Sequence, residues 1–316
     1  MIRCCIFDVR LLYSSHPGHP TQSALMKLIT FTEHHRRRIG ILDDQTVIDL
    51  SLAAPHLPQT MLAFLRAGDA AMDEARRAVA TDKRRLEIAN VRLEAPVPRP
   101  GKVLAIGMNY ADHIKETGRA APEHQVWFAK QATCIIGPND KIELPKASDK
   151  VDYEAELCVV IGKRCRHVPR ARAMEVIAGF MCGNDVSVRD WQARTPTMMM
   201  GKGFDTHGPI GPWIVTKEEI ANPQALKIRC RLNGEIMQDA STADMIFDIG
   251  AQIEHLTTAF TLEPGDVIFT GTPSGVGNWR TPPVRLKAGD KVSVEIESVG
   301  TLENLCVVEP GETVIL

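Results

Sequence analysis

The pattern of apolar and polar positions changes twice along the chain. From Lys27 the runs LITFTE, IGILDD and TVIDL are separated by polar residues, which predicts a small antiparallel meander. Residues 59–80 are rich in Ala, Leu and Arg and predict helix, with a break at Gly68. Residues 94–102 then carry three prolines and a glycine, a composition typical of a linker. The pattern therefore predicts a small N-terminal unit followed by a larger one.

The remaining two thirds of the chain consists mainly of short β-type runs separated by Gly and Pro turns. These runs do not repeat as strand, helix, strand, so a doubly wound parallel sheet is disfavoured. We expect an α+β fold whose core is a mixed β-roll or β-sandwich. Helices are expected at residues 169–181 and 247–259, and LNGEIMQ contains the Asn-Gly signal of a hairpin.

These patterns divide the chain into three parts. Residues 1–25 are interpreted as a disordered extension, since Asp8 and Arg10 interrupt the apolar run that a signal peptide would need. Residues 26–95 form the expected small β-rich N-terminal domain. Residues 96–316 form the expected catalytic domain.

Composition narrows the class of protein. The chain has 316 residues, is 44% hydrophobic and has a formal net charge of −2, so it can bury a full core and has no global basic field for nucleic acid. The basic cluster HHRRR is interpreted as a solvated hairpin tip. Eight cysteines without metal-type spacing indicate reduced thiols in a cytoplasmic protein. No stretch reaches the roughly 20 apolar residues of a membrane span, so no membrane partner is expected.

Three carboxylates stand in the most informative part of the chain. Glu154 and Glu156 lie two residues apart in a β-type run, which places both side chains on one face of a strand. Asp185 follows after a segment expected to be helical. Three converging carboxylates would repel one another unless a hard divalent cation lay between them, and Mg²⁺ or Mn²⁺ fits best, with Ca²⁺ possible. An isolated Glu-x-Glu is also typical of a strand with one solvated face.

Other side chains are candidates for the same site. His113 and Glu116 are three residues apart, so on a helix the carboxylate can orient the imidazole. Arg189 and Gln192 follow Asp185 at helical spacings of four and seven. Gln192 is expected to contact a ligand, and Arg189 to contact it or support the carboxylates.

Two glycine-rich segments also attract attention. Lys202 stands in MMMGKGFDTHGP, where it could reach into a site or remain an exposed loop lysine. The segment TGTPSGVG lacks the Gly-Lys-Ser/Thr ending of a nucleotide-binding loop. Its backbone N–H groups could still hold a carboxylate.

The stretches VDYEAELCVVIGK, GNDVSVRDWQ, GKGFDTHGPIGPWIV and TGTPSGVG resemble the fumarylacetoacetate hydrolase family, metal-dependent enzymes that act on 2-oxo and β-diketo acids. The resemblance extends from about Lys102 to the C-terminus and is to the short bacterial type, such as acylpyruvate hydrolases and 2-hydroxyhepta-2,4-diene-1,7-dioate isomerases. It implies that His113 and Glu116 activate water. It also implies that Lys202 stabilises an enolate and that Thr272 binds the carboxylate of the substrate.

Together, these observations predict a metal-dependent enzyme that acts on a 2-oxo acid through an enolate. Hydrolysis of a C–C bond, as in acylpyruvates, is the first expectation. Decarboxylation or isomerisation of an oxaloacetate- or hydroxymuconate-type diacid is the alternative. A non-catalytic protein that binds small acids is a more distant alternative, because such a protein does not need His113 and Glu116. The family resemblance also implies a homodimer.

Overall fold

The computed structural model describes residues 26–311 and residue 315. The extension expected at residues 1–25 lies outside the described residues. Among the residues that are described, no helix is long and apolar enough to cross a membrane.

The described part of the chain begins with the expected antiparallel meander. It consists of β1 (Lys27–Glu33), β2 (Arg36–Asp43) and β3 (Thr46–Asp49). At the first turn, Arg38 forms ion pairs with Glu33 and Asp49. Part of the charge of the basic cluster is therefore compensated within the meander itself.

The N-terminal unit continues with helices that cover one face of its strands. They are α1 (Leu50–Ala53), α2 (Met61–Arg66) and α3 (Gly68–Thr81), followed by β4 (Leu86–Glu87), η1 (Ile88–Asn90) and β5 (Arg92–Leu93). Gly68 has φ +69°, a value that glycine adopts easily, and it separates α2 from α3 at the expected break. Ala71, Ala75 and Ala78 recur at helical spacing and form the buried face of α3.

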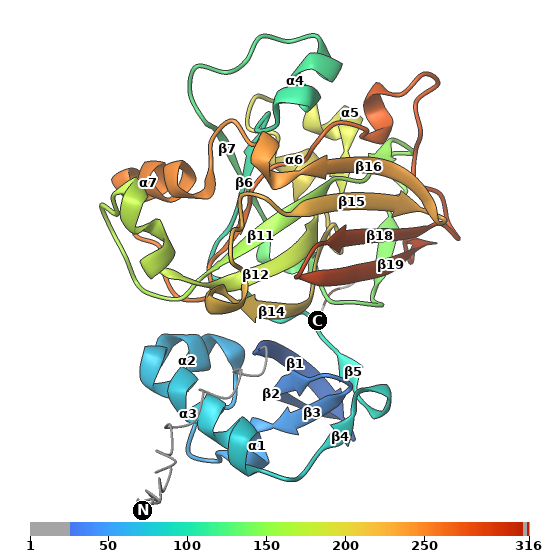
Figure 1. The fold of residues 1–316 in the computed structure, drawn as a ribbon. Coiled ribbons are helices and arrows are strands. Elements are labelled where there is room, and N and C mark those ends of the chain that lie inside the picture. Colours follow the sequence, from blue (N-terminus) through green and yellow to red (C-terminus); the bar gives the residue numbers. More distant parts are fainter. Residues whose placement is uncertain (1–25, 312–314, 316) are drawn as a thin grey trace, which may run out of the picture.

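A central mixed sheet joins this unit to the rest of the chain (Figure 1). Its strand order is β4-β3-β2-β1-β14-β12-β11-β17-β6-β7. The strands not yet introduced are β6 (Val103–Gly107), β7 (Val126–Lys130), β11 (Ala155–Ile161), β12 (Ile177–Asn184), β14 (Gly208–Thr216) and β17 (Val267–Phe269). The junction is the pairing of β1 with β14, where Lys27 lies opposite Val215. A domain division near residue 95 stays a prediction.

A second sheet of five strands packs on the central one. Its order is β16 (Glu235–Ser241), β15 (Lys227–Leu232), β18 (Lys291–Ile296), β19 (Gly300–Val308) and β9 (Lys141–Leu144). On β11, Leu157 and Val159 share a core cluster with Ile228 and Val294 of this sheet. Val160, which points the other way, belongs to the cluster that contains helix α2. Strand β11 is therefore buried on both faces, which explains its continuous apolar sequence.

Short elements connect the strands within each sheet and between the two sheets. The helices are α4 (Ala111–Thr117), α5 (Arg189–Gln192), α6 (Met199–Lys202) and α7 (Ile249–Ala259), and the 3₁₀ turns are η2 (Ala132–Cys134), η3 (Arg170–Glu175), η4 (Lys217–Glu219), η5 (Thr242–Asp244) and η6 (Gly277–Trp279). Three further short strands are β8 (Ile135–Ile136), β10 (Val151–Asp152) and β13 (Ser187–Val188). The α+β prediction is confirmed, and α7 matches the helix expected at 247–259.

The helix expected at residues 169–181 is wrong. Only η3 is helical, and the chain enters strand β12 at Ile177. The Ala-rich start favours helix locally, but the following IAGFMCGN pairs with β11 on one side and β14 on the other. Tertiary pairing in the middle of a sheet outweighs local propensity there.

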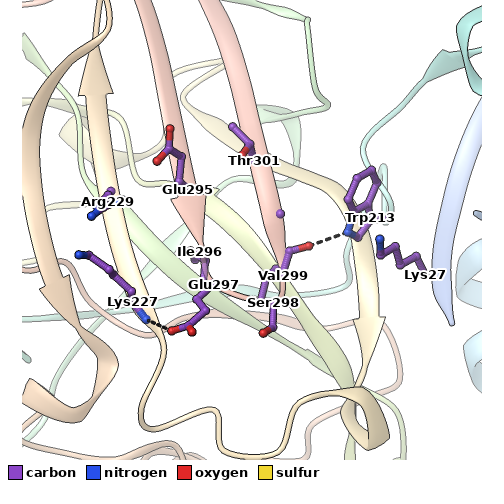
Figure 2. A pocket seen from close by; sticks show the side chains of 11 residues that line it. Lys27, Trp213, Lys227, Arg229, Glu295, Ile296, Glu297, Ser298, Val299 and Thr301 are labelled. Carbon is purple, nitrogen blue, oxygen red and sulfur yellow. Dashed lines mark hydrogen bonds between the residues drawn. The ribbon is translucent and has the colours of Figure 1, made fainter. Parts of the chain in front are cut away.

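A groove lies between strands β1 and β14 of the central sheet and strands β15, β18 and β19 of the second sheet (Figure 2). Its volume is about 610 Å³, and Trp213 closes one side by donating a hydrogen bond from Nε1 to the carbonyl of Val299 at 2.6 Å. Lys27 Nζ lies 4.8 Å from the centre of the Trp213 ring. This groove shares no lining residue with the acidic cleft described next.

Candidate active site

Antiparallel pairing of two central strands brings the three carboxylates together. Ala155 on β11 lies opposite Asn184 at the end of β12, so Glu154 and Glu156 flank the point where Asp185 leaves the sheet. All three carboxylates are buried, and one oxygen of each lies within 4.8 Å of an oxygen of the others. A strand therefore stands between the Glu pair and Asp185, where the sequence led us to expect a helix.

Two buried lysines neutralise part of this charge. Lys202 Nζ lies 2.7 Å from Glu154 Oε2 and 2.7 Å from Asp185 Oδ2. Lys130 Nζ lies 2.6 Å from Asp185 Oδ1 and also donates to the carbonyl of Lys202. Sequence reasoning missed Lys130. The available signal was its position in the alternating strand VWFAK, on the same face as the buried Phe128.

Arg189 contacts Glu154 at the carboxylate oxygen that Lys202 does not contact. Its Nη1 lies 2.7 Å from Glu154 Oε1, and its Nη2 lies 2.7 Å from Asp152 Oδ2. Nη1 also donates to Gln192 Oε1 at 3.0 Å, so the side chain of Gln192 is held through Arg189. These residues do not share a helix with Asp185, because β13 intervenes and α5 begins at Arg189. Asp152 is a second residue that the sequence did not single out.

The ion pairs do not compensate all the buried charge. Burial would raise the pKa of Glu154, but Lys202 and Arg189 outweigh it and lower that pKa to about 2. For Glu156, burial together with the neighbouring Asp185 and Glu154 raises the pKa well above its usual value. Burial alone would lower the pKa of Lys202, yet the two carboxylates that it contacts raise it. Glu156 is therefore the carboxylate that the site leaves without sufficient positive charge.

The three carboxylates could hold a divalent metal ion. Four buried carboxylates face three cations in this cluster, namely Asp152, Glu154, Glu156 and Asp185 against Lys130, Arg189 and Lys202. Glu156 forms no ion pair within the described part of the chain and accepts a hydrogen bond from the N–H of Gly271 at 2.7 Å. Its missing partner and the all-oxygen donor set fit a hard cation of the Mg²⁺ or Mn²⁺ type.

Helix α4 carries the His-Glu pair to the edge of the same cleft. His113 Nδ1 lies 3.0 Å from Glu116 Oε2, and the other oxygen of Glu116 accepts from the N–H of Gly275 at 2.9 Å. Glu116 therefore fixes both the imidazole and the position of α4 against the loop at residues 270–277. The hydrogen bond at Nδ1 leaves Nε2 as the imidazole nitrogen that can exchange a proton with a ligand.

The loop at residues 270–277 acts as a set of backbone donors to carboxylates of the protein. Besides the bond from Gly275, Gly271 donates to Glu156, and Gly277 donates to Asp152 Oδ1 at 2.8 Å. Gly271 and Gly275 both have φ +98°, a conformation that favours glycine. The loop thus positions the site, and several of its donors are already used for that.

Thr272, on this loop, lines the cleft with its hydroxyl group engaged. It donates to the carbonyl of Ala155 at 2.9 Å and accepts from Gln238 Nε2 at 2.8 Å. Its expected role as a ligand for the substrate carboxylate stays a prediction.

The cleft that these groups share has a volume of about 860 Å³. Its lining includes His113, Glu154, Glu156, Arg189, Gln192, Lys202 and Thr272. The arrangement combines an acidic floor, a buried lysine and a histidine that can move a proton. Such a site can bind an anionic oxygen-rich ligand and stabilise negative charge that develops on it.

The sequence of residues 102–308 matches the family described as fumarylacetoacetate (FAA) hydrolase C-terminal. The chain belongs to this family. The resemblance drawn from the sequence motifs is thereby confirmed over the whole catalytic part.

Individual relatives cover nearly the whole chain. A mitochondrial oxaloacetate tautomerase of Bos taurus is 48% identical over 294 residues, which are 91% of this chain and 93% of that protein. The solved structure of a fumarylacetoacetate hydrolase from Exiguobacterium antarcticum has a TM-score of 0.79 and 36% identity. That of a maleylpyruvate hydrolase from a Sphingobium species, in complex with manganese(II) and pyruvate, has a TM-score of 0.76 and 30% identity. Each comparison with these two structures covers 90% of this chain and 100% of the other. The family thus includes both isomerising and hydrolysing enzymes.

Proposed function

We propose that this protein catalyses the enol–keto interconversion of a 2-oxo dicarboxylate of the oxaloacetate type. The observation that carries the proposal is the His113–Glu116 pair, fixed at the edge of the cleft whose lining includes Glu154 and Glu156 of the carboxylate triad. The long similarity to the Bos taurus enzyme, which is named an oxaloacetate tautomerase, supports this reaction. Enol–keto interconversion therefore takes the place of C–C bond hydrolysis as the first proposed reaction.

The reaction moves one proton and breaks no bond between carbon atoms. The enol loses its proton from the oxygen on C2, and the resulting enolate gains a proton on C3. A catalyst therefore needs a group that exchanges protons and a positive environment for the enolate oxygen. A divalent ion held by Glu154, Glu156 and Asp185 would supply Lewis-acid stabilisation of that oxygen.

Side chains of this protein supply the remaining requirements. His113, with Nδ1 held by Glu116, exchanges the proton through Nε2. Lys202 brings a buried positive charge to the same floor, since its Nζ contacts both Glu154 and Asp185. Because the cleft is lined by these groups at once, proton exchange and charge stabilisation act on one bound substrate.

The test is the loss of enol absorbance of oxaloacetate, followed with added Mg²⁺ and with excess chelator. We expect the protein to accelerate ketonisation with Mg²⁺ and to lose that effect with chelator. An unchanged enol decay in both conditions, for a folded protein, would refute the proposal.

Two variants separate the roles of His113 and Lys202. His113→Ala should slow ketonisation by about 10² to 10⁴, the usual contribution of general acid–base catalysis, while oxalate binding stays nearly unchanged. Lys202→Ala should weaken the binding of oxalate, a planar enolate mimic, as well as slow turnover. Full activity in His113→Ala would show that this pair does not move the proton.

Hydrolysis of an acylpyruvate is a second candidate, supported by the structural similarity to the maleylpyruvate hydrolase. The same His113 would then deprotonate water for attack on the distal carbonyl. A release of pyruvate from acylpyruvates that His113→Ala abolishes would favour this reaction. Decarboxylation of oxaloacetate would instead appear as release of CO₂ in the same assays. The cytoplasmic location stays a prediction, since the Bos taurus relative is named mitochondrial.

A further inference from the structure

The mouth of the cleft has a charge opposite to that of its floor. Arg119, Lys150, Arg194 and Arg285 line it, and none of them forms an ion pair with a carboxylate of the described residues. Besides Glu154 and Glu156, the described residues that line the cleft include one acidic side chain, Asp190, which accepts a hydrogen bond from the hydroxyl of Ser148 at 2.6 Å. A bound substrate that extends from the floor to the mouth therefore has positive charge around the end that lies at the mouth.

Arg285 differs from the other mouth cations because its side chain is held in place. The residue is half-buried, and its Nη2 donates to Asn278 Oδ1 at 2.8 Å. Its Nη1 donates to the carbonyl of Val284 at 3.2 Å. A guanidinium has five N–H groups, so one on each terminal nitrogen remains for a ligand. Two such donors in one plane match the two oxygens of a carboxylate.

A continuous series of contacts connects this arginine to the floor of the site. The N–H of Asn278 donates to Asp152 Oδ2 at 2.8 Å, and the same oxygen lies 2.7 Å from Arg189 Nη2. Arg189 Nη1 in turn lies 2.7 Å from Glu154 Oε1. The position of Arg285 is thus fixed relative to Glu154 by ionic and hydrogen-bonded contacts. Because Arg285 is held at a fixed distance from the floor, the site can favour ligands whose two charged ends are separated by a matching distance.

We propose that Arg285, held by Asn278, binds the second carboxylate of the substrate and makes the site specific for 2-oxo acids with a carboxylate at each end. The inference rests on the proposed function and deepens it. The 2-oxo carboxylate end occupies the floor, and Arg285 selects against analogues that end in a methyl group.

The other mouth cations are less suited to this role. Arg119 is exposed and follows helix α4. The guanidinium of Arg194 lies 3.9 Å from the centre of the Trp191 ring, so one of its faces is covered by the indole. Arg194 still contributes the same charge at the same mouth, which makes it the matched control.

The test measures binding rather than turnover. Wild-type protein with Mg²⁺ is titrated in a calorimeter with 2-oxo dicarboxylates of four to six carbons and with 2-oxo monocarboxylates of equal length. We expect at least one dicarboxylate to bind about 10- to 100-fold more tightly than its monocarboxylate counterpart, the usual effect of a charged hydrogen-bonded pair. Arg285→Gln should abolish this ratio and leave the affinity for monocarboxylates within about twofold.

Three further variants complete the design. Arg285→Lys should keep part of the ratio, because it retains the charge without the planar pair of donors. Asn278→Ala should lower the ratio by releasing the guanidinium, and Arg194→Gln should leave it unchanged. The inference is overturned by a wild-type protein without preference, by a ratio that survives Arg285→Gln, or by an equal loss in Arg194→Gln.

Failure of this inference is distinguishable from failure of the proposed function. A protein that binds dicarboxylates through Arg285 but does not accelerate ketonisation of oxaloacetate would refute only the proposed reaction. If the Arg285→Gln variant accelerates ketonisation as well as the wild-type protein and keeps the same ratio of dicarboxylate to monocarboxylate affinity, only the role of Arg285 is refuted.

Discussion

Glu156 is a buried carboxylate that the protein leaves without a cation of its own. Its neighbours Glu154 and Asp185 are paired with Lys202, and Arg189 and Lys130 add one further contact to each. A buried charge in this position costs stability in the metal-free protein. A bound cation would remove this cost, and the free energy thus recovered would contribute to the affinity of the site for the cation.

The metal site can therefore be tested with two substitutions of opposite effect on stability. Glu156→Gln should raise the free energy of unfolding of the metal-free protein by about 1 kcal/mol, since it removes a carboxyl group whose ionised form is disfavoured by burial and by Asp185 and Glu154. Glu154→Gln should lower it, because Lys202 and Arg189 lose a partner. Both variants should lose the stabilisation that Mg²⁺ gives the wild-type protein, about 2.7 kcal/mol at 100 times the dissociation constant.

Thermal unfolding with Mg²⁺ and with chelator measures all these quantities. A normal Mg²⁺-dependent shift in both variants would exclude the triad as the metal site. Equal destabilisation of both metal-free variants would instead contradict the charge imbalance at Glu156.

His207 makes a separate, pH-dependent contribution to the stability of the folded protein. Its Nε2 donates to the carbonyl of Glu143 at 2.9 Å, while Nδ1 is buried without a partner in the described residues. Burial lowers the pKa of His207 to about 4, whereas an unburied histidine has a pKa of 6.5. The folded state thus binds the proton less well, so stability is full above about pH 6.5 and falls as the pH approaches 4.

The expected loss over that pH range is roughly 3 kcal/mol from this residue alone. His207→Gln should reduce the total loss of stability between pH 6.5 and 4 by this amount, measured by urea titrations along that range. His255→Gln, at an exposed position on α7, is the control. A slope that both variants leave unchanged would contradict the assignment to His207.

At the scale of elements, the loop at residues 270–277 depends on backbone conformations that its glycines allow. Gly271 has φ +98°, and an added Cβ would lie 2.7 Å from Cβ of Asn109. Gly271→Ala should cost roughly 1–3 kcal/mol in stability and weaken metal binding, because its N–H holds Glu156. Gly289 has φ +92° with open space around it, so Gly289→Ala should carry the backbone cost without the effect on metal. Equal metal affinities in the two variants would show that the Gly271 bond is not needed.

The elements also show what the sequence could and could not predict. The meander and α7 were predictable because their local patterns and their tertiary environments agree. Residues 177–181 were predicted as helix because Ala, Met and Phe fit either structure and the run is buried on both faces of the sheet. Nothing local marks a central strand of this kind.

The same limit applies to the site. Glu154, Glu156 and Asp185 were predicted as a cluster because strand alternation places the two glutamates on one face and the family resemblance covers the segments that carry all three. Lys130 and Asp152 were not, because the distant partner of each is set only by folding; the alternation of VWFAK indicates that Lys130 faces the core but does not identify Asp185 as its partner. Arg285 was missed for the same reason.

At the scale of the whole molecule, the cleft lies where separate layers meet. Its floor comes from central strands β11 and β12, its proton-exchanging pair from α4, and its mouth from residues around η6. Figure 1 shows α4, α5 and α6 gathered at the end of the molecule away from the N-terminal strands. Loading the site with metal should therefore stabilise the assembled layers as a unit.

Assembly into a twofold homodimer is the last prediction. Met199 and Met200 on α6 are 41% and 51% exposed, although α6 also carries the buried Lys202. Exposed apolar side chains beside a site are stabilised when a second subunit covers them, and twofold pairs are the commonest closed assemblies. Light scattering at micromolar concentration should give twice the mass of the chain. Replacing both methionines by glutamate should lower that mass and reduce turnover, because α6 would lose its support. A monomeric mass for the unaltered protein would exclude the dimer, and a dimer that keeps its mass and activity after both substitutions would place its interface away from α6.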